Sequence, residues 1–273
     1  MIDESNLVII ISQSGETADT LAALREAKRL GAKTLAIVNV VGSAIAKAAD
    51  HTIYTWAGPE IAVATTKGYT TQLTVLYLFA LYAAKQLKTV DNAAFHQYLS
   101  TLKSLPKLIQ QALDMNPGIH QVAKKYHSAY SMFFIGRNTD YAVALEGALK
   151  MKEISYIHAE SYAAGELKHG TIALICEGQP VIALCCNDSI AEKTMSNIVE
   201  VKARGAEVLA VAFRDDTRIV SLADDMLYIP KIDPLFSAAV EIIPLQLLAY
   251  HVARENDCDI DKPKNLAKSV TVE

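Results

Sequence analysis

Apolar residues fall into two patterns along the chain: short continuous runs and longer stretches with helical spacing. Residues 7–11 form a continuous apolar run, as expected for a buried parallel strand. Across residues 17–30 the apolar positions recur at helical spacing and stop at Gly31, a residue suited to follow a helix. Further strands are predicted at 34–38 and 52–55. This alternation predicts an α/β fold of parallel sheets with helices on both faces.

Segments 174 residues apart resemble one another. Residues 30–32 (LGA) are similar to residues 204–206 (RGA), and Gln72-Leu73 recurs as Gln246-Leu247. Similarity at one fixed spacing indicates a repeated structural unit, so we predict two copies of one module. In the second copy, strands are expected at 181–184, 208–211 and 226–228, with a helix ending near residue 203.

The second copy opens with elements that the first copy does not show. These are a strand at 131–135 and the helix that follows Arg137, whereas Met1 corresponds to Ile175 at the same spacing. We therefore expect the first module to begin partway through the repeat. Residues 91–115 should form a helical connector, and Asn116-Pro117-Gly118 is the predicted turn and boundary. The expected divisions are 1–115, 116–258 and a polar tail at 259–273.

Composition narrows the class of protein. The chain has 273 residues, about half of them apolar, and a net charge of −4. This charge gives no basic surface for nucleic acid or an anionic membrane. The longest apolar stretch, 73–84, is too short to cross a bilayer and is predicted to be a buried helix. The amino terminus has no signal-peptide features, and the four cysteines form no CxxC pair, so a reducing cytoplasm is expected.

Histidine spacing bears on metal binding. The seven histidines show neither HxH nor HxxxH spacing, so no metal site is predicted. No motif for a nucleotide or redox cofactor appears, and we expect the protein to need no cofactor.

The loop at 12–17 (SQSGET) joins the first predicted strand to the first predicted helix. Ser14 is predicted to cap the helix, and Gly15 to let the backbone approach a ligand closely. The carboxyl end of a strand next to a helix N-terminus is where α/β sheets bind phosphate. A well-capped helix without a ligand gives the same pattern. The neutral donors that the loop adds are the side chains of Ser12, Gln13, Ser14 and Thr17.

The second copy carries a different loop. At the 174-residue spacing it has Cys186-Asn187-Asp188-Ser189, with Asp188 in the place of Ser14. An aspartate there would repel a phosphate dianion. One phosphate site is therefore expected, in the first module.

Three charged residues share one side of a predicted helix. Glu146, Lys150 and Glu153 are spaced four and three residues apart, which makes them neighbours on the helix surface. They form either an exposed salt-bridge face or a group suited to proton transfer. His169 is either an ordinary loop or core histidine or a functional one. Lys268 is either a solvated tail residue or a nucleophilic amine.

The loop at 12–17 and several other stretches of the sequence resemble a known family. The loop at 12–17 is similar to the signature of the sugar isomerase (SIS) domain. Other stretches resemble the isomerase half of the glutamine–fructose-6-phosphate aminotransferase family, and the resemblance runs from about residue 5 to the end. The closing stretch is the most specific, because other SIS domains lack it. These stretches are 60–67 (EIAVATTK), 145–156 (LEGALKMKEISY), 163–170 (AAGELKHG) and 265–273 (NLAKSVTVE).

The resemblance implies two flavodoxin-like SIS modules, the first incomplete at its start. It also implies an enzyme of amino-sugar synthesis that converts fructose 6-phosphate and ammonia into glucosamine 6-phosphate. In that family the loop residues Ser12, Gln13, Ser14 and Thr17 would contact the phosphate and the sugar. Val63 and Thr65 would line the sugar site, and Thr65 stands where many members have serine.

The resemblance also implies catalytic roles. Glu153 would move a proton between C1 and C2 of the sugar, with Lys150 assisting. His169 would open the sugar ring and, in the family, is supplied across a homodimer interface. Lys268 would form a Schiff base with the open-chain ketose.

Two departures from the family limit what is expected. No counterpart of the glutaminase domain is found in these residues, and residue 2 is Ile2 rather than a catalytic cysteine. The opening of the first module, with another phosphate-contacting serine, is also absent. Glutamine hydrolysis is therefore not expected, and phosphate binding should be weakened.

Two other functions remain open. A fructosamine-phosphate deglycase would use the same fold, although the terminal stretch around Lys268 argues against it. A non-catalytic sugar-phosphate-binding module would bind the ligand without turnover. Neither a helix-turn-helix nor a basic patch supports DNA binding.

Overall fold

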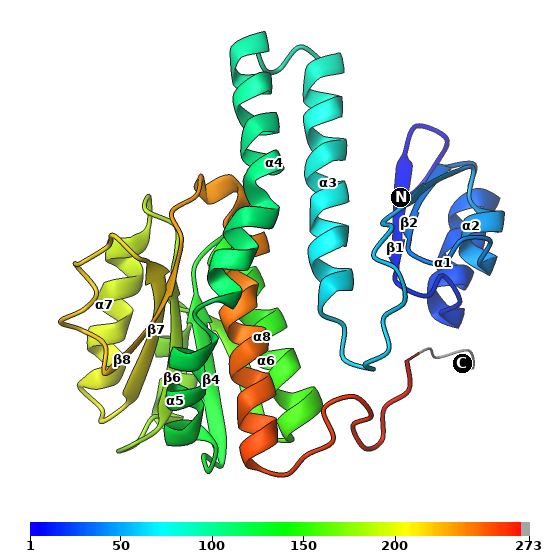
Figure 1. The fold of residues 1–273 in the computed structure, drawn as a ribbon. Helices are drawn as coiled ribbons and strands as arrows, with labels where there is room; N and C mark the ends of the chain where they lie inside the picture. The colour runs from blue at the N-terminus through cyan, green and yellow to red at the C-terminus, as the bar shows by residue number, and fades with distance from the viewer. Residues whose placement is uncertain (269–273) are drawn as a thin grey trace. The chain divides into compact units, whose positions relative to one another are not determined.

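The computed structural model describes residues 1–268, except for the side chain of Asn116, so the end of the predicted terminal stretch, 269–273, lies outside the described residues. The chain divides into two compact units, one of residues 1–95 with the tail from residue 264 and one of residues 96–263 (Figure 1). Each unit contains one parallel sheet, so the predicted α/β class is confirmed. The predicted module boundary at 115/116 lies inside the second unit.

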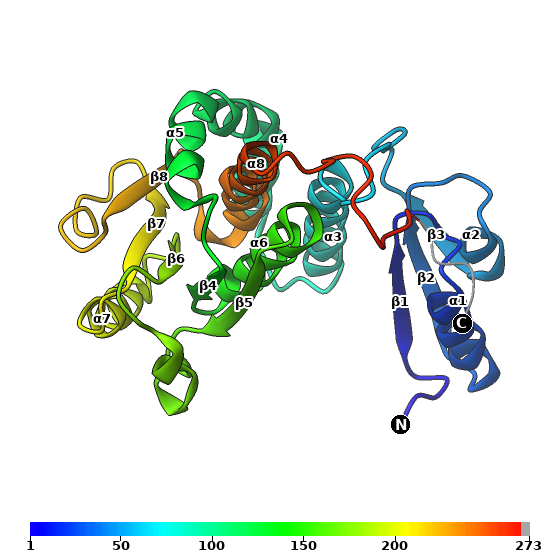
Figure 2. The ribbon, with the colours of Figure 1, turned by 90° about the horizontal axis from the view of Figure 1, so that it is seen from below.

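The first unit holds a three-stranded parallel sheet in the order β1-β2-β3. The strands are β1 (Leu7–Ser12), β2 (Lys33–Val38) and β3 (His51–Tyr54). Helices α1 (Ala18–Arg29) and α2 (Ala44–Ala48) cover one face, as Figure 2 shows. The core beneath them consists of Ile10, Leu24, Ala36, Val38 and Ile45.

Three helices follow this sheet along the chain: α3 (Lys67–Gln86), α4 (Asn92–Leu113) and α5 (Asn116–Tyr126). Helix α4 confirms the predicted helical connector. The predicted turn at Asn116-Pro117-Gly118 is wrong, because α5 begins there with its proline in the first turn. An amide in that position has no intrahelical partner, so proline costs nothing there.

Helix α3 confirms the predicted helix at 73–84, but it is not buried as expected. Only Gly68 and Leu81 in α3 are buried, although the helix is apolar on all sides. A helix of this kind is normally covered on every face. The physical reason is that a cavity, rather than packed side chains, lies between α3 and the first sheet.

The second unit holds a five-stranded parallel sheet in the order β5-β4-β6-β7-β8. Helix α7 (Ala191–Lys202) packs on one face through Ile198 and Val201. Helices α6 (Thr139–Ser155) and α8 (Ala238–Glu255) lie together, with Gly147 of α6 close against Leu245 of α8. The strands are β4 (Ser131–Gly136), β5 (His158–Ala163), β6 (Pro180–Cys185), β7 (Glu207–Phe213) and β8 (Asp225–Ile229).

The two sheets confirm the internal repeat. Asp50 accepts a hydrogen bond from the Thr34 amide at 2.9 Å, and Asp224 accepts one from the Val208 amide at 2.8 Å. Both pairs are 174 residues apart. A lysine on the preceding helix pairs with each aspartate, Lys28 in the first unit and Lys202 in the second. The modules therefore share their strand-end contacts as well as their order of elements.

The register corrects one detail of the repeat. Leu7 pairs with Lys33, whereas the residue that pairs with Glu207 is Pro180. Strand β1 is therefore 173 residues from β6, so Cys185 stands in the place of Ser12. The loops after β1 and β6 have the same length, so Asn187 stands in the place of Ser14, and the expected match of Asp188 with Ser14 is wrong.

In the part of the chain that is described, no helix combines the length and apolar character needed to span a membrane.

Candidate functional site

The loop after β1 is held by its own hydroxyl groups. Ser12 Oγ accepts a hydrogen bond from the Gly15 amide at 3.0 Å and lies 3.5 Å from Thr17 Oγ1. Ser14 Oγ accepts from the Glu16 amide at 3.2 Å. The predicted helix cap at Ser14 is wrong: α1 begins at Ala18, after an N-cap Thr17 whose side chain makes no capping bond. Both serine hydroxyls are engaged inside the loop, so no side chain of the loop caps the N-terminus of α1.

Position 15 requires glycine because its backbone lies close to the side chain of Ser43. Its φ is +69°, and a methyl group added there would lie 2.1 Å from Ser43 Oγ. The Gly15 carbonyl accepts a hydrogen bond from the Ile45 amide at 2.9 Å. Glu16 Oε1 accepts from the Ala44 amide, also at 2.9 Å. The loop is thus fixed onto the first turn of α2.

Replacing Gly15 by alanine is expected to destabilise the first unit. The added methyl group meets Ser43, and the positive φ adds strain, each costing on the order of 1–3 kcal/mol. Urea unfolding measures the loss of stability.

Gly42→Ala is the matched control, because Gly42 has a φ of +75° but open space where the methyl group would go. It should show the strain alone. Equal losses in the two variants would contradict the packing of the loop against Ser43.

Glu60 organises the segment before α3. Its Oε1 accepts hydrogen bonds from the amides of Thr66 at 2.9 Å and Gly68 at 3.1 Å. Its Oε2 lies 2.9 Å from Lys268 Nζ, and the side chain is only 3% exposed. Burial favours a higher pKa for Glu60, but the hydrogen bonds from Lys268 and the two amides outweigh it and lower that pKa. Glu60 is therefore an ionised carboxylate at neutral pH.

Lys268 is anchored in the first unit. Its Nζ donates to Glu60 Oε2 and, at 2.8 Å, to the carbonyl oxygen of Ala62. The alternative of a solvated tail lysine is therefore wrong for the described structure. Sequence analysis did not select Glu60 as a site residue. The available signal was its place at the start of the family-like stretch 60–67.

The serine loop and the lysine anchor meet at Gly68. A methyl group added at Gly68 would lie 2.8 Å from Gln13 Oε1 and 3.0 Å from Glu60 Oε2. Gln13 Oε1 is buried and has no hydrogen-bond partner among the described residues. Val63 and Thr65 are half-buried within the same segment. The first unit thus brings the predicted substrate-binding loop, the 60–67 segment and Lys268 together.

The charged group on α6 is centred on a buried lysine, and its two glutamates are partly buried. Lys150 Nζ lies 2.5 Å from Glu153 Oε2 and 3.3 Å from Glu146 Oε1, and the Lys150 side chain is 4% exposed. The three residues are neighbours, as predicted, but the alternative of an exposed salt-bridge face is wrong. Burial raises the pKa of Glu146 against the lowering effect of Lys150. This cluster can therefore exchange protons away from bulk water.

His169 lies elsewhere in the second unit. It ends the short 3-10 helix η1 (Leu167–His169), and its side chain is exposed. Glu153, Lys150 and His169 all belong to the second unit, whereas the serine loop and Lys268 belong to the first.

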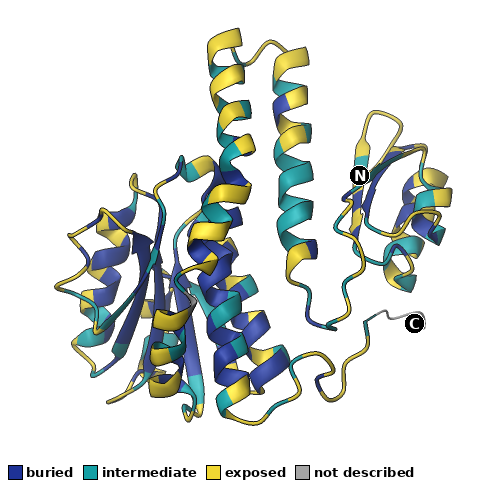
Figure 3. Ribbon diagram, viewed as in Figure 1, coloured by how far each residue is buried: buried dark blue, intermediate teal, exposed yellow. Residues whose placement is uncertain are grey.

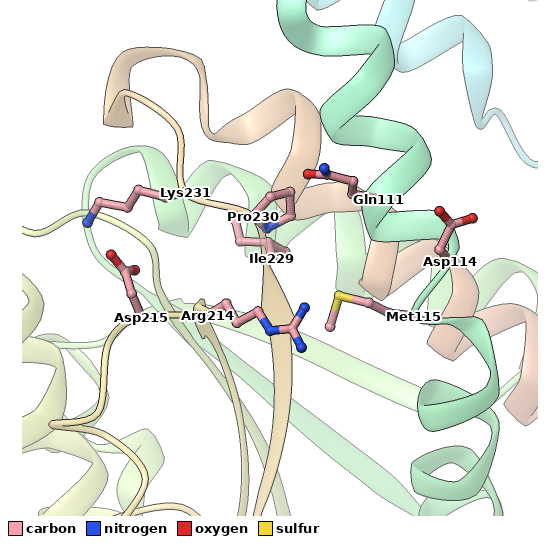
Figure 4. A pocket seen from close by; sticks show the side chains of 8 residues that line it. All are labelled: Gln111, Asp114, Met115, Arg214, Asp215, Ile229, Pro230 and Lys231. Carbon is pink, nitrogen blue, oxygen red and sulfur yellow. The ribbon is translucent and has the colours of Figure 1, made fainter.

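A separate cavity of about 570 Å³ lies at the carboxyl ends of β7 and β8 (Figure 4). None of the predicted site residues lines it. Arg214 and Lys231 contribute cations there, but Lys231 is paired with Asp188 at 2.7 Å. Among the described residues, no group of histidine, cysteine and carboxylate side chains is arranged to hold a metal ion.

Comparison with known proteins places these features in a family. A SIS domain model matches residues 1–82 and 125–255. Over its full length the chain is 52% identical to a glutamine–fructose-6-phosphate aminotransferase (isomerizing) of Clostridium tetani and 53% identical to one of Caldanaerobacter subterraneus. It spans 45% of the length of each of these relatives.

A solved structure agrees with this assignment. The C-terminal domain of a glucosamine-fructose-6-phosphate aminotransferase from Francisella tularensis is 39% identical, with a TM-score of 0.91. The match covers 96% of this chain and 75% of that domain. The chain therefore belongs to the SIS domain family, and it corresponds to the C-terminal isomerase half of the glutamine–fructose-6-phosphate aminotransferases.

Proposed function

We propose that this chain is the sugar-phosphate half of an aminotransferase that converts fructose 6-phosphate and ammonia into glucosamine 6-phosphate. The observation that carries the proposal is the anchoring of Lys268. Its ammonium group is held by Glu60 and the Ala62 carbonyl, in the segment that meets the serine loop at Gly68. An amine and a set of neutral anion-binding donors in one unit suit an open-chain ketose phosphate.

The phosphate would be bound by the loop after β1. The side chains of Ser12, Ser14 and Thr17 and the uncapped N-terminus of α1 provide hydrogen-bond donors and the positive end of a helix dipole. Gln13 points its amide toward the Glu60 segment and would contact the sugar, with Val63 and Thr65 alongside.

The imine step would use Lys268 and Glu60. A lysine amine attacks a carbonyl carbon only after it loses its proton. Glu60 is ionised and 2.9 Å from Lys268 Nζ, so it can accept that proton. Attack on C2 of the ketose and loss of water would give the Schiff base. Ammonia would then replace the lysine.

The second unit would carry out the proton transfer. Glu153 would move a proton from C1 to C2, and Lys150, paired with both Glu146 and Glu153, would keep the carboxylate oriented. His169 is exposed and would open the sugar ring from a second copy of the chain, which requires a homodimer.

The four cysteines are free, which fits a protein that works in a reducing cytoplasm.

Product analysis tests this function. The chain is incubated with fructose 6-phosphate and ammonium, and products are identified by mass spectrometry and NMR. Glucosamine 6-phosphate is the expected product. Turnover of fructosamine phosphates alone would favour a deglycase, and binding without turnover would favour a sugar-phosphate sensor. No binding heat with millimolar fructose 6-phosphate or glucosamine 6-phosphate would contradict the substrate class.

A further inference from the structure

The loop after β6 is the counterpart of the serine loop after β1. The first loop leads from the end of β1 at residue 12 to the start of α1 at 18, and the second from the end of β6 at 185 to the start of α7 at 191. The backbone amides of residues 13 and 14 therefore correspond to those of Cys186 and Asn187. In the first module, neither of these amides has a hydrogen-bond partner among the described residues.

In the second module, the same two amides bind a carboxylate of the protein itself. Asp140 Oδ2 accepts a hydrogen bond from the Cys186 amide at 2.9 Å, and a backbone hydrogen bond from Asn187 also favours its charged form. Asp140 lies in the first turn of α6, whose N-cap residue, Asn138, makes no side-chain capping bond. The N-terminus of a helix favours an anion, so the carboxylate is held from two sides.

Gly136 fixes the position of this carboxylate. It is the last residue of β4, and a methyl group added there would lie 2.6 Å from the carbonyl carbon of Asp140. The first turn of α6 can therefore pack directly on the end of the strand. Strand β4 lies between β5 and β6, so the chain turns to opposite sides of it. The carboxyl end of such a strand is the crevice in which open α/β sheets bind ligands.

A second buried carboxyl group lies near Asp140. Glu241 belongs to α8, which Figure 3 shows largely in the dark blue of buried residues, and it is fully buried. Burial, and then the nearby charge of Asp140, raise the pKa of Glu241 well above its usual range. Burial also raises the pKa of Asp140, to about 7, against the backbone hydrogen bonds that lower it. The donor that faces Glu241 is the weak Cys186 thiol, so Glu241 holds the proton and Asp140 carries the negative charge of the pair.

We propose that Asp140 fills, from within the protein, an anion-binding site of the second module, so that this module is closed to sugar phosphates. A phosphate placed on the Cys186 amide would overlap the Asp140 carboxylate and would be repelled by its charge. The mismatch of Asp188 with Ser14 removes the reason that the sequence offered for a single phosphate site, and Asp140 supplies another. The contrast with the first module rests on the proposed function, whereas the anion site itself does not.

Formate is the probe for this site, because it is a carboxylate small enough to replace the side chain that Asp140→Ala removes. At about pH 8, above the pKa of Asp140, the full-length variant should unfold at a lower temperature than the wild-type chain, because two buried amides lose their acceptor. Sodium formate at about 100 mM should raise the Tm of the variant by about 3 °C over sodium chloride at the same concentration. The Tm of the wild-type chain should be the same in both salts.

Asp140→Asn is the matched control, because it keeps the size of the side chain and an acceptor oxygen but carries no charge. Formate should not change its Tm, since the site stays filled. In its NMR spectrum the amide protons of Cys186 and Asn187 should move upfield, because a hydrogen bond to a carboxylate is stronger than one to a neutral oxygen. Unchanged amide shifts, or no formate effect on folded Asp140→Ala, would overturn the proposal. If Asp140→Ala folds in neither salt, the amide shifts decide.

Calorimetry with fructose 6-phosphate separates this proposal from the proposed function. One equivalent of ligand per wild-type chain is expected. Two equivalents would show that the second module is open, which would overturn the role of Asp140. No binding by the wild-type chain, together with formate rescue of Asp140→Ala, would support the anion site and contradict the proposed function instead.

Discussion

Replacing Lys268 by alanine should remove the borohydride-trappable adduct between the chain and fructose 6-phosphate. We expect the Lys268 amine of the wild-type chain to form an imine with C2, which borohydride would reduce to a stable secondary amine. Mass spectrometry then detects the added hexose phosphate. The adduct should fall to background in the variant, a loss of at least about two orders of magnitude, because Lys268 is the amine that the proposed function places at the carbonyl.

Two further variants make this result specific. Lys262→Ala removes an exposed lysine from the same tail and should leave trapping unchanged. Glu60→Gln keeps the shape of the anchor but removes its charge and its ability to accept a proton, so trapping should become slower without disappearing. If Lys268→Ala still gives the adduct at the wild-type rate, Lys268 is not the imine-forming residue.

The strands and the repeat could be predicted because their signals are local. Apolar runs such as residues 7–11 define buried strands, and the 174-residue spacing requires only pairwise similarity. The one-residue shift at β1 could not be predicted, because no residue in the sequence marks it. Only the pairing of Leu7 with Lys33 and of Pro180 with Glu207 reveals it.

Burial was predicted less well than secondary structure. The apolar composition of 73–84 predicts burial only if something covers the helix, and coverage is a tertiary property. Conversely, Glu146, Lys150 and Glu153 have the pattern of an exposed face, yet Lys150 is buried. Packing of α6 against α8 decides this, and it depends on Gly147 and Leu245, nearly a hundred residues apart.

Some residues of the candidate site could be predicted from the sequence, and others could not. The serine loop was recognisable because its residues are consecutive. The contact between Lys268 and Glu60 joins positions at opposite ends of the chain, so no spacing rule predicts it. Ser14 was assigned as a helix cap on residue type alone, whereas the structure uses its hydroxyl for the Glu16 amide.

Replacing Glu153 by glutamine should slow the conversion of fructose 6-phosphate by about 10²–10⁴-fold, the usual contribution of a positioned general base. Imine trapping at Lys268 should persist, because that step does not use Glu153. The fold should also persist, since Lys150 keeps Glu146 as a partner at 3.3 Å. Steady-state product formation with ammonium and borohydride trapping measure the two effects on the same preparation.

Glu146→Gln is the matched control, because it removes the other carboxylate from the same buried lysine. It leaves Glu153 paired with Lys150, so turnover should stay within about tenfold of wild type. Equal losses in the two variants would mean that the cluster matters only for holding Lys150. Loss of trapping in Glu153→Gln would place Glu153 in ligand binding rather than in proton transfer. Slow turnover with intact trapping in Glu153→Gln is therefore the result that would assign proton transfer to Glu153 and imine formation to Lys268.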